Sequence, residues 1–446
     1  MNAAIIGTGH VGLVTGACLA EIGHRAVCVD DDRKKIATLQ AGGVPFYESH
    51  LEALLRRNRA AGRLSFTDRL EEGVGQADII FICVGTPALA NGEADLSAVE
   101  QVARRIAESV TGYRLVVEKS TVPVQTGRWI ERTLAIYNGG RAKCDVASNP
   151  EFLREGSAVE DFLHPDRIVV GVGDARAEEL LRALYAPIVD GTFPCPIHDP
   201  CLKRQPIPFL VTNIESAELI KHASNAFLAM KISFINAMAD LCERAGADVT
   251  SVAEGVGLDH RIGKSFLNAG IGFGGYCFPK DLQAFVKIAE KLGYDFALLK
   301  EVERINQTRA ALVLQKLKAH LWLLKGKRIG IWGLAFKPET DDVREAPAFR
   351  IIELLLQEGA EVRAYDPKAM ANARAHLSAV TFCPDPYEAV EGAEALVVAT
   401  EWAEFLQLDL GRVKARMRVP LFLDGRNCFD KKALQHIGFE YVGMGR

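Results

Sequence analysis

The stretch Ala3-Ala-Ile-Ile-Gly7-Thr-Gly9-His-Val-Gly12 decides the fold of this chain. Its apolar residues predict a short buried strand, and a G-x-G-x-x-G sequence follows directly. An apolar helical pattern comes next, and Arg25-Ala-Val-Cys-Val-Asp30 predicts a second strand that ends in an acid. Glycines in this setting allow a tight turn and the close approach of a pyrophosphate to the helix N-terminus. The first thirty or so residues therefore predict a dinucleotide-binding unit.

The acid that ends the second strand bears on which cofactor binds. Asp30 can accept hydrogen bonds from a ribose diol, whereas its negative charge would repel the 2′-phosphate of NADP. The sequence therefore predicts NAD as the cofactor.

Composition narrows the class of protein. The chain has 446 residues, too many for one hydrophobic core, and its 49% hydrophobic and 25% charged residues are ordinary for a globular enzyme. A net charge of −4 gives no reason to expect nucleic acid or an anionic membrane as a partner. The ten cysteines are scattered without a repeated close spacing, so neither a disulfide framework nor a metal site is indicated. We expect a protein of the reducing cytoplasm.

Three further strands are predicted, and each runs into a motif rich in small residues or proline. The motifs are Gly85-Thr-Pro87, Ser120-Thr-Val-Pro123 and Asn149-Pro-Glu-Phe-Leu-Arg-Glu155. In an open parallel sheet, ligands bind beyond the carboxyl ends of the strands. One such pocket would be lined by hydroxyl and carboxylate groups, namely those of Thr86, Thr121, Glu151 and Glu155. Each could be an ordinary turn residue, but four in succession favour the pocket.

The rest of the chain divides into a helical block and a second α/β region. Five prolines interrupt the pattern between Pro194 and Pro208, and Thr212-Asn-Ile-Glu215 then opens a helix predicted to reach Gly246. Strand patterns resume at Lys327, where a second glycine turn lacks the third glycine of the fingerprint. We predict an α/β fold with two Rossmann-like doubly wound domains joined by a central helical block with a long connecting helix. The predicted domains are 1–205, 206–322 and 323–446.

A glycine-rich loop within the helical block ends in a single thiol. The loop, Asn268-Ala-Gly-Ile-Gly-Phe-Gly-Gly-Tyr-Cys-Phe-Pro-Lys-Asp281, has four glycines that let the backbone take positive φ and lie close against a ligand. A cysteine presented beside a lysine can be a covalent nucleophile. Taken alone, the loop fits better the commoner case of a turn followed by a buried thiol.

Six motifs stand in order along the whole chain. They are Ser120-Thr-Val-Pro123, Asn149-Pro-Glu-Phe-Leu-Arg-Glu-Gly156, Glu218-Leu-Ile-Lys-His-Ala-Ser-Asn225, Gly272-Phe-Gly-Gly-Tyr-Cys-Phe-Pro-Lys-Asp281, Gly333-Leu-Ala-Phe-Lys337 and Asp424-Gly-Arg-Asn427. With them the chain resembles the UDP-glucose/GDP-mannose dehydrogenase family, and most of all its members that oxidise UDP-glucose. The resemblance implies an NAD-dependent four-electron oxidation of the C6 alcohol of UDP-glucose to the carboxylate of UDP-glucuronate.

The resemblance also implies roles for catalytic residues. Lys221 and Asp281 would hold the water that removes the alcohol proton, and Lys221 would stabilise the alkoxide. Cys277 would capture the aldehyde as a thiohemiacetal, whose oxidation gives a thioester. Glu151 would activate the water that hydrolyses this thioester. Two side chains would orient these groups, Thr121 and Asn225.

Binding residues and partners follow from the same resemblance. The cofactor-binding residues would be Gly7, Gly9, Val11, Gly12, Asp30, Lys35, Gly85, Thr86, Thr121, Glu155, Lys280 and Arg344. The UDP-sugar-binding residues would be Glu151, Phe152, Leu153, Arg154, Glu155, Lys221, Asn225, Arg261, Phe273, Gly274, Phe336, Lys337 and Arg426. Because Arg261 matches an arginine that family dimers contribute across their interface, we expect a homodimer or a higher homo-oligomer.

Two features depart from the family pattern. Tyr276 precedes the cysteine where a small residue is usual. The segment from Pro194 to Pro208 is longer than the usual connection and carries Cys195 and Cys201. Those two thiols suggest redox or metal chemistry, but no second pair of ligands stands nearby in the sequence, which argues against it.

Other functions share some of these features. Tyr276 and Lys280 match the Y-x-x-x-K pair of short-chain reductases, but that pair needs a helix, which Pro279 and the preceding glycines oppose. GDP-mannose or a UDP-N-acetylhexosamine stays open as the substrate. A non-catalytic nucleotide-sugar-binding protein would not need Lys221 and Cys277 together, and a simple hydroxyacid dehydrogenase would not need the thiol.

Overall fold

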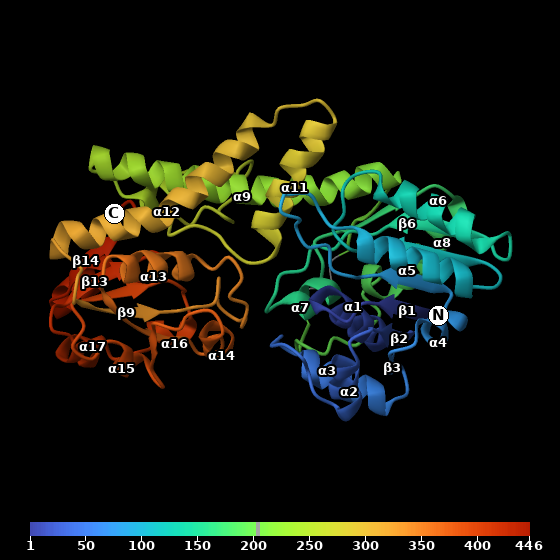
Figure 1. The fold of residues 1–446 in the computed structure, drawn as a ribbon, viewed down its shortest axis with the longest axis horizontal. Coiled ribbons are helices and arrows are strands. Elements are labelled where there is room, and N and C mark those ends of the chain that lie inside the picture. Colours follow the sequence, from blue (N-terminus) through green and yellow to red (C-terminus); the bar gives the residue numbers. More distant parts are fainter. Residues whose placement is uncertain (202–205) are drawn as a thin grey trace. The chain divides into compact units, whose positions relative to one another are not determined.

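The computed structural model describes residues 1–201 and 206–446, which form two compact units (Figure 1). The first unit consists of Met1–Ser224 and Gln283–Ile288, and the second of Asn225–Leu282 and Ala289–Arg446. The predicted domain boundary after residue 205 adjoins residues 202–205, which lie outside the described residues. Within the described ranges, no helix has the length and apolar character needed to cross a membrane.

The first unit is built on an eight-stranded sheet with the order β3-β2-β1-β4-β5-β6-β7-β8. Its strands are β1 (Asn2–Ile6), β2 (Arg25–Val29), β3 (Leu64–Thr67), β4 (Ile79–Ile82), β5 (Arg114–Glu118), β6 (Cys144–Ser148), β7 (Ile168–Val172) and β8 (Phe209–Thr212). Its helices are α1 (His10–Glu21), α2 (Arg33–Ala41), α3 (Leu51–Ala60), α4 (Leu70–Gly75), α5 (Ser97–Ser109), α6 (Thr126–Asn138), α7 (Ala158–Leu163) and α8 (Ala175–Val189). All neighbouring strands are parallel except β6 and β7, a reversal that the strand patterns of the sequence do not reveal.

Alternating residues of the central strand fill two separate cores. Ile5 packs with Leu13 of α1 in one buried cluster. Ile6, on the opposite face, packs with Val99 and Ile106 of α5 in another. Because a strand buried on both faces has no solvent side, it reads as a continuous apolar run. This explains why the first strand of the sequence is uniformly apolar, and it makes the unit a three-layer α/β/α sandwich.

Two helices contribute residues to both units. The long helix α9 (Ile214–Ala245) confirms the predicted connecting helix, and the unit division falls after its residue Ser224. The second is α11 (Cys277–Lys291). The other helices of the central block are α10 (Val249–Gly257) and α12 (Ala297–Leu321).

The second unit contains a six-stranded, wholly parallel sheet with the order β11-β10-β9-β12-β13-β14. Its strands are β9 (Arg328–Trp332), β10 (Glu361–Tyr365), β11 (Thr381–Phe382), β12 (Ala395–Val398), β13 (Leu421–Asp424) and β14 (Glu440–Gly443). The helices around it are α13 (Pro347–Gln357), α14 (Met370–Arg374), α15 (Pro386–Ala389), α16 (Ala403–Leu406), α17 (Leu410–Arg416) and α18 (Lys431–Ile437). Figure 1 shows α13 on one side of these strands and α15 and α17 on the other. This strand order is that of the dinucleotide-binding fold, so the prediction of two Rossmann-like sheets and a helical block is confirmed.

Candidate functional site

The three glycines of the G-x-G-x-x-G sequence between β1 and α1 are required for different physical reasons. Gly7 has φ +100°, and a Cβ there would lie 2.7 Å from the carbonyl oxygen of Cys83. A Cβ on Gly12 would lie 1.9 Å from the carbonyl oxygen of Gly7. A Cβ on Gly9 would meet no protein atom within 4 Å. The fold itself therefore requires the first and third glycines, whereas Gly9 leaves bare backbone at the N-terminus of α1, as a pyrophosphate needs.

Asp30 lies at the carboxyl end of β2 and is almost fully buried. Its Oδ2 accepts hydrogen bonds from the backbone N and Oγ1 of Thr8, both at 2.7 Å, and from Lys35 Nζ at 3.0 Å. Burial acts to raise the pKa of Asp30, but hydrogen bonds from Thr8, Asp32 and Lys35 outweigh it and hold the pKa below its usual value. The group is thus an ionised acceptor, as a ribose diol requires.

A cavity of about 330 Å³ is lined by five of the ten cofactor residues predicted in this unit. Those that line it are Gly7, Gly9, Asp30, Lys35 and Gly85. Nearby in sequence, Thr86 Oγ1 donates a hydrogen bond of 2.8 Å to the carbonyl oxygen of Thr121, so the ends of two neighbouring strands are tied together. Val11, in the first turn of α1, is half-buried and does not line the cavity.

A buried ion pair joins Glu151 to the long helix. Glu151 Oε1 lies 2.8 Å from Lys221 Nζ, and both side chains are about 95% buried. The other oxygen, Oε2, accepts a 2.6 Å hydrogen bond from the backbone N of Leu153. Lys221 Nζ also lies 5.6 Å from the centre of the Phe152 ring. The predicted base and the predicted oxyanion-stabilising lysine are therefore direct neighbours.

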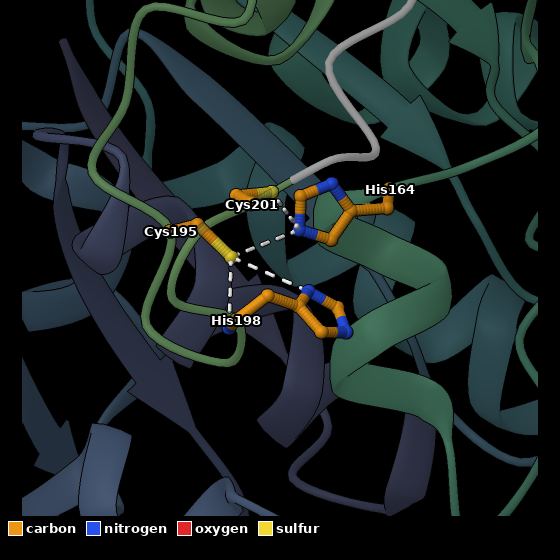
Figure 2. A group of neighbouring side chains, drawn as sticks. All are labelled: His164, Cys195, His198 and Cys201. Carbon is orange, nitrogen blue, oxygen red and sulfur yellow. Dashed lines mark hydrogen bonds between the residues drawn. The ribbon is translucent and has the colours of Figure 1, made fainter.

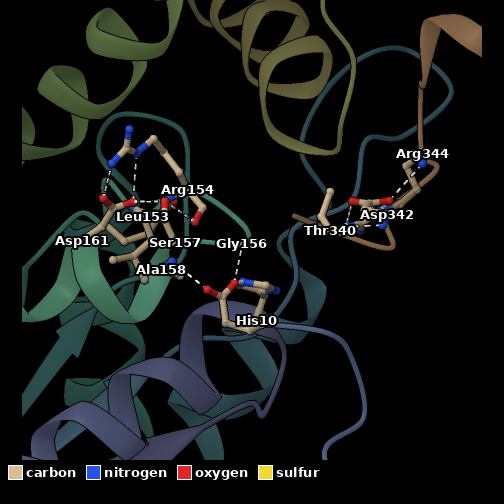
Figure 3. Close-up of polar contacts among 12 residues, drawn as sticks. His10, Leu153, Arg154, Gly156, Ser157, Ala158, Asp161, Thr340, Asp342 and Arg344 are labelled. Atoms are coloured by element: carbon tan, nitrogen blue, oxygen red, sulfur yellow. Dashed lines mark hydrogen bonds and ion pairs between the residues drawn. The ribbon is translucent and has the colours of Figure 1, made fainter. Parts of the chain in front are cut away.

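The rest of this loop is fixed by contacts that sequence reasoning missed. Glu48 has no exposed side-chain surface; it pairs with His10 Nε2 at 2.6 Å and accepts hydrogen bonds from the backbone N of Gly156 and Ala158 (Figure 3). Nothing in the spacing of the sequence marks this carboxylate. Glu48 therefore ties α1 to the loop that carries Glu151.

Two residues of this loop that are predicted to bind a ligand are not fully buried. Arg154 is exposed and forms a 2.6 Å ion pair with Asp161 (Figure 3). Glu155 is half-buried.

In the second unit, the helix α11 begins at Cys277, so the prediction that Pro279 opposes a helix here is wrong. Proline is tolerated in the first helical turn, where its missing N–H has no helical partner to lose. Cys277 and Asp281 are one turn apart on the same face. Asp281 Oδ2 accepts a 2.7 Å hydrogen bond from Asn225 Nδ2, and Oδ1 lies 2.8 Å from Lys280 Nζ. The thiol is thus presented at a helix N-terminus, with a fixed carboxylate one turn behind it.

Tyr276 lies between two cations. Its ring centre is 4.3 Å from the guanidinium carbon of Arg344 and 5.4 Å from Lys280 Nζ. Arg344 in turn pairs with Asp342 at 2.6 Å (Figure 3). Cation–π contacts of this kind hold both basic side chains near the thiol loop, which gives this unusual residue a structural reason.

The glycines of the thiol loop are needed to pack it against its own unit. A Cβ on Gly274 would lie 2.0 Å from the carbonyl oxygen of Glu345, and one on Gly275 would lie 2.7 Å from the ring of Phe336. Phe273 is held at both backbone groups by the amide of Asn306, at 2.9 and 3.0 Å. The sequence predicts that these glycines let the backbone approach a ligand. The structure adds a second reason for glycine at these positions, because a side chain would collide with the rest of the unit.

Arg426 is committed to backbone carbonyls of the same unit. It donates hydrogen bonds to the carbonyl oxygens of Ala399 and Gly272 at 2.8 Å and of Phe336 at 3.2 Å. It also lines a cavity of about 200 Å³ together with Lys264 and Asn268, two polar residues that sequence reasoning missed.

The other predicted basic residues lie elsewhere in this unit. Lys337 Nζ is 5.8 Å from the centre of the Phe336 ring. The side chain of Arg261 is 78% exposed and pairs with Asp259.

Comparison with known proteins covers the whole chain. Three models of one family match in succession: the NAD binding domain at residues 1–189, the central domain at 215–308 and the UDP binding domain at 330–431. The chain belongs to the UDP-glucose/GDP-mannose dehydrogenase family. It is therefore an oxidoreductase, and NAD is its cofactor.

Individual members of the UDP-glucose/GDP-mannose dehydrogenase family match closely. UDP-glucose 6-dehydrogenase TuaD of Bacillus subtilis is 46% identical over 99% of this chain and 93% of its own length. UDP-glucose 6-dehydrogenase of Rhizobium meliloti is 46% identical over the full length of both chains. The solved structure of a UDP-glucose dehydrogenase from Pyrobaculum islandicum has a TM-score of 0.90 and 42% identity over 100% of this chain and 97% of that one.

Family membership assigns the two sheets of this dehydrogenase to different ligands. The NAD binding domain contains the Gly9 turn, Asp30 and the 330 Å³ cavity. The UDP binding domain contains Phe336, Lys337 and Arg426. The central domain contains Lys221, Asn225 and the cysteine loop.

Proposed function

We propose that this dehydrogenase oxidises UDP-glucose to UDP-glucuronate, with two NAD reduced for each sugar. Support comes from the relatives named as UDP-glucose 6-dehydrogenases, which match along the full length at up to 46% identity. The conversion of a primary alcohol to a carboxylate removes four electrons, so it needs two hydride transfers with an aldehyde-level stage between them. A thiol is useful for that stage, because it holds the aldehyde on the protein.

The observation that carries the proposal is the arrangement of Cys277 at the start of α11. Asp281 follows one turn later on the same face, and its carboxylate is fixed by the 2.7 Å hydrogen bond from Asn225. The helix N-terminus favours negative charge, as a thiolate nucleophile requires. A redox-neutral binding protein has no use for a thiol and carboxylate oriented in this way.

In the first oxidation, the C6 hydroxyl loses its proton and C6 loses a hydride. We assign the stabilisation of the alkoxide to the buried ammonium group of Lys221, and the proton passes to water for which Asp281 is the acceptor. NAD, held by the Gly9 turn and Asp30, would supply the hydride acceptor for each of the two oxidations. Lys221 is suited to its role because Glu151 fixes its Nζ at 2.8 Å in a buried setting.

In the second oxidation, the Cys277 sulfur forms a bond to the aldehyde carbon and gives a thiohemiacetal. Loss of a hydride from that carbon and of the proton from its hydroxyl, which passes to water, leaves a thioester. Water then attacks the thioester, the carbon–sulfur bond breaks, and the thiol returns with the carboxylate as product. We assign the removal of the proton from this water to Glu151, with Thr121 and Asn225 as orienting groups.

Binding of the UDP moiety is assigned to the C-terminal domain and the thiol loop. Lys337 and Arg426, together with the loop around Phe273, are the proposed contacts; the family description of this domain as UDP binding supports the assignment. Arg426 also lines the 200 Å³ cavity with Lys264. Basic groups at the turns after parallel strands suit a diphosphate.

We also propose a homodimer, in which the partner subunit receives Arg261. Support comes from the exposure of this side chain. It forms an ion pair with Asp259, two residues away in the sequence, and breaking an exposed pair of this kind costs little free energy. Light scattering at the assay concentration and after strong dilution would measure the oligomeric state. A monomer with full specific activity would show that the dimer is not required for catalysis.

The test of the function is a count of NADH per sugar. Purified protein with UDP-glucose should give two NADH for each sugar consumed, and one NADH would refute the four-electron reaction. Cys277→Ser should lose this stoichiometry, while Cys144→Ser, at the start of β6, should keep it. Full turnover by Cys277→Ser would refute the nucleophile assignment.

Substrate competition tests the identity of the sugar nucleotide. GDP-mannose and a UDP-N-acetylhexosamine are the rival substrates, and each should have a kcat/KM far below that of UDP-glucose. A rival with the higher kcat/KM would replace UDP-glucose in the proposal and leave the chemistry unchanged.

A further inference from the structure

Two cysteines and two histidines converge in the first unit, and none of them is among the residues assigned above. They are His164, which directly follows α7, and Cys195, His198 and Cys201 from the connection between α8 and β8 (Figure 2). Their ligand atoms all lie within 4.8 Å of one another. Cys195 and Cys201 are free thiols. One of the two histidines, His198, lies between the cysteines in the sequence, and the fold supplies the other, His164, from a helix end 31 residues before Cys195.

The distances fit a tetrahedral metal centre. With zinc–sulfur bonds near 2.3 Å and zinc–nitrogen bonds near 2.0–2.1 Å, tetrahedral ligand atoms are roughly 3.3–3.8 Å apart. Here Cys195 Sγ lies 3.2 Å from His164 Nε2 and 3.6 Å from His198 Nδ1. Cys201 Sγ lies 3.8 Å from His164 Nε2. Three of the six distances among the four ligand atoms thus lie within about 0.1 Å of this range, and the others are at most 4.8 Å, so a bound ion would need to draw the ligands together only slightly.

Hydrogen bonding alone accounts poorly for this cluster. Cys195 Sγ is contacted by three nitrogen atoms: His164 Nε2, His198 Nδ1 and the backbone N of His198 at 3.3 Å. A thiol has a single weak donor and is a weak acceptor. A thiolate bound to a cation, with imidazole nitrogens as its fellow ligands, satisfies the same atoms fully.

The donor set identifies the metal. Two thiolates and two imidazoles form the Cys₂His₂ set of structural zinc sites. Calcium and magnesium prefer oxygen ligands, iron–sulfur clusters usually take four cysteines, and blue-copper sites take one cysteine with a weak axial ligand. Four protein ligands leave no open position, so the ion would be structural rather than catalytic.

A carboxylate stands behind one ligand, as in many zinc sites. Glu160 Oε1 lies 3.6 Å from His198 Nε2, the ring nitrogen that faces away from Cys195. Such an outer partner fixes the ring and its tautomer. Glu160 and His164 are four residues apart, and the backbone N of His164 donates to the carbonyl oxygen of Glu160 at 2.8 Å. One turn of α7 therefore provides both a ligand and the support for another.

We propose that His164, Cys195, His198 and Cys201 bind one zinc ion that ties the α8–β8 connection to α7. The described part of this connection has no helix or strand, so its position depends on side-chain contacts. At the other end of α7, the backbone N of Ala158 is bound to Glu48. The ion would thus brace the helix next to the loop that carries Glu151. This assignment is independent of the substrate and of the catalytic roles proposed above.

Metal analysis of the full chain, purified without a histidine tag or chelator, tests the proposal. Elemental mass spectrometry should find about one zinc for each chain. Replacement of zinc by cobalt should give the intense visible bands of tetrahedral cobalt and a thiolate-to-cobalt charge-transfer band. Removal of the metal with a chelator should lower the melting temperature by several degrees.

Variants separate this site from unspecific binding. Cys195→Ser and His164→Gln should each lose the zinc, whereas Cys144→Ser, a half-buried thiol of the same unit, should retain it. If a variant fails to fold, the zinc content and cobalt spectrum of the unaltered protein still decide.

Three results would overturn the proposal. They are a folded protein with no zinc that takes up neither zinc nor cobalt from solution, retention of zinc by both site variants, and a Cys195–Cys201 disulfide in protein kept under reducing conditions.

Discussion

Alanine at Gly9 should weaken NAD binding without harming the fold, whereas alanine at Gly12 should harm the fold itself. The two positions are three residues apart in the same turn, so each is the other's control. Gly9 has φ −68° and ψ −172°, a conformation that alanine adopts readily, and its Cβ would meet no protein atom within 4 Å. Gly12 lies inside α1, and its Cβ would lie 1.9 Å from the carbonyl oxygen of Gly7.

The expected magnitudes follow from these distances. Real Cβ atoms keep at least 3.0 Å from other heavy atoms, so Gly12→Ala must displace α1 or the Gly7 turn by about an ångström. Overpacking of a rigid core costs about 1–3 kcal/mol of unfolding free energy. Gly9→Ala should change that free energy by less than about 0.5 kcal/mol. Its methyl group would occupy the approach of the pyrophosphate, and the dissociation constant for NAD should rise at least tenfold, or ~1.4 kcal/mol.

Two measurements on each variant check this pair. Thermal unfolding without cofactor reports on the fold, and isothermal titration with NAD reports on binding. Gly9→Ala with an unchanged NAD dissociation constant would refute the argument that its bare backbone serves the pyrophosphate. Gly12→Ala with the melting temperature of the unaltered protein would refute the steric argument for the third glycine.

Three further predictions concern other side chains. Lys221→Met should lower kcat by roughly 10²–10³-fold with a smaller change in KM, because an oxyanion donor acts mainly in the transition state; an unchanged kcat would contradict the role. Burial raises the pKa of Glu218 to about 7, against hydrogen bonds from the backbone N of Gly127 and Gln125. The folded state therefore favours the protonated acid. As the pH rises from about 4.5 to 7, the unfolding free energy should fall by up to about 3 kcal/mol more than that of Glu218→Gln, which cannot ionise. Urea titrations in which the two proteins show the same pH dependence would contradict this prediction. Tyr276→Leu should raise the KM for NAD more than Tyr276→Phe, which keeps the ring between its two cations, and equal effects would exclude the cation–π role.

The sheets could be predicted because their signals are local. The apolar run before Gly7 and the acid at Asp30 define a strand–turn–helix–strand unit by short-range chemistry alone. The lack of internal glycine or proline predicts the connecting helix, which runs from Ile214 to Ala245. The predicted capping residue is displaced by one position, because Thr212 ends β8 and Asn213 Oδ1 accepts the hydrogen bond from Ser216 N. Both predictions depend on neighbours within a few residues in the sequence.

The start of α11 was mispredicted because proline has two opposite meanings. Pro279 breaks a helix in its interior but is tolerated in a first turn. Nothing before it in the sequence distinguishes the two cases, because the glycines of the loop are also typical of a turn. The structure starts the helix at Cys277 and so places the thiol where a helix favours an anion.

Contacts between distant segments could not be predicted from spacing. Glu48 holds Gly156 and Ala158, more than a hundred residues away, and no periodic pattern marks it. For the same reason, the sequence does not indicate that His164 lies beside Cys195, which is 31 residues away. Local motifs indicate which elements form, whereas these partners depend on how the elements pack.

The two Rossmann-like sheets show how one fold comes to bind two ligands. Asp30, after β2, and Asp366, after β10, hold equivalent places at the ends of second strands. Asp366 is 1% exposed, and its Oδ2 accepts hydrogen bonds from the backbone N of Leu334 and Ala335 and from Trp402 Nε1. Those backbone groups form the turn after β9, where a pyrophosphate would otherwise be bound. Asp30 accepts from one backbone N of the turn after β1, that of Thr8, whereas Asp366 accepts from two of the turn after β9. One more N–H group of the turn after β9 is therefore already bonded within the protein, which makes this turn less suited to a pyrophosphate. Asp366→Ala should destabilise the C-terminal domain, because two backbone N–H groups and the Trp402 indole lose their buried acceptor. A variant that unfolds at the same urea concentration as the unaltered protein would contradict this role.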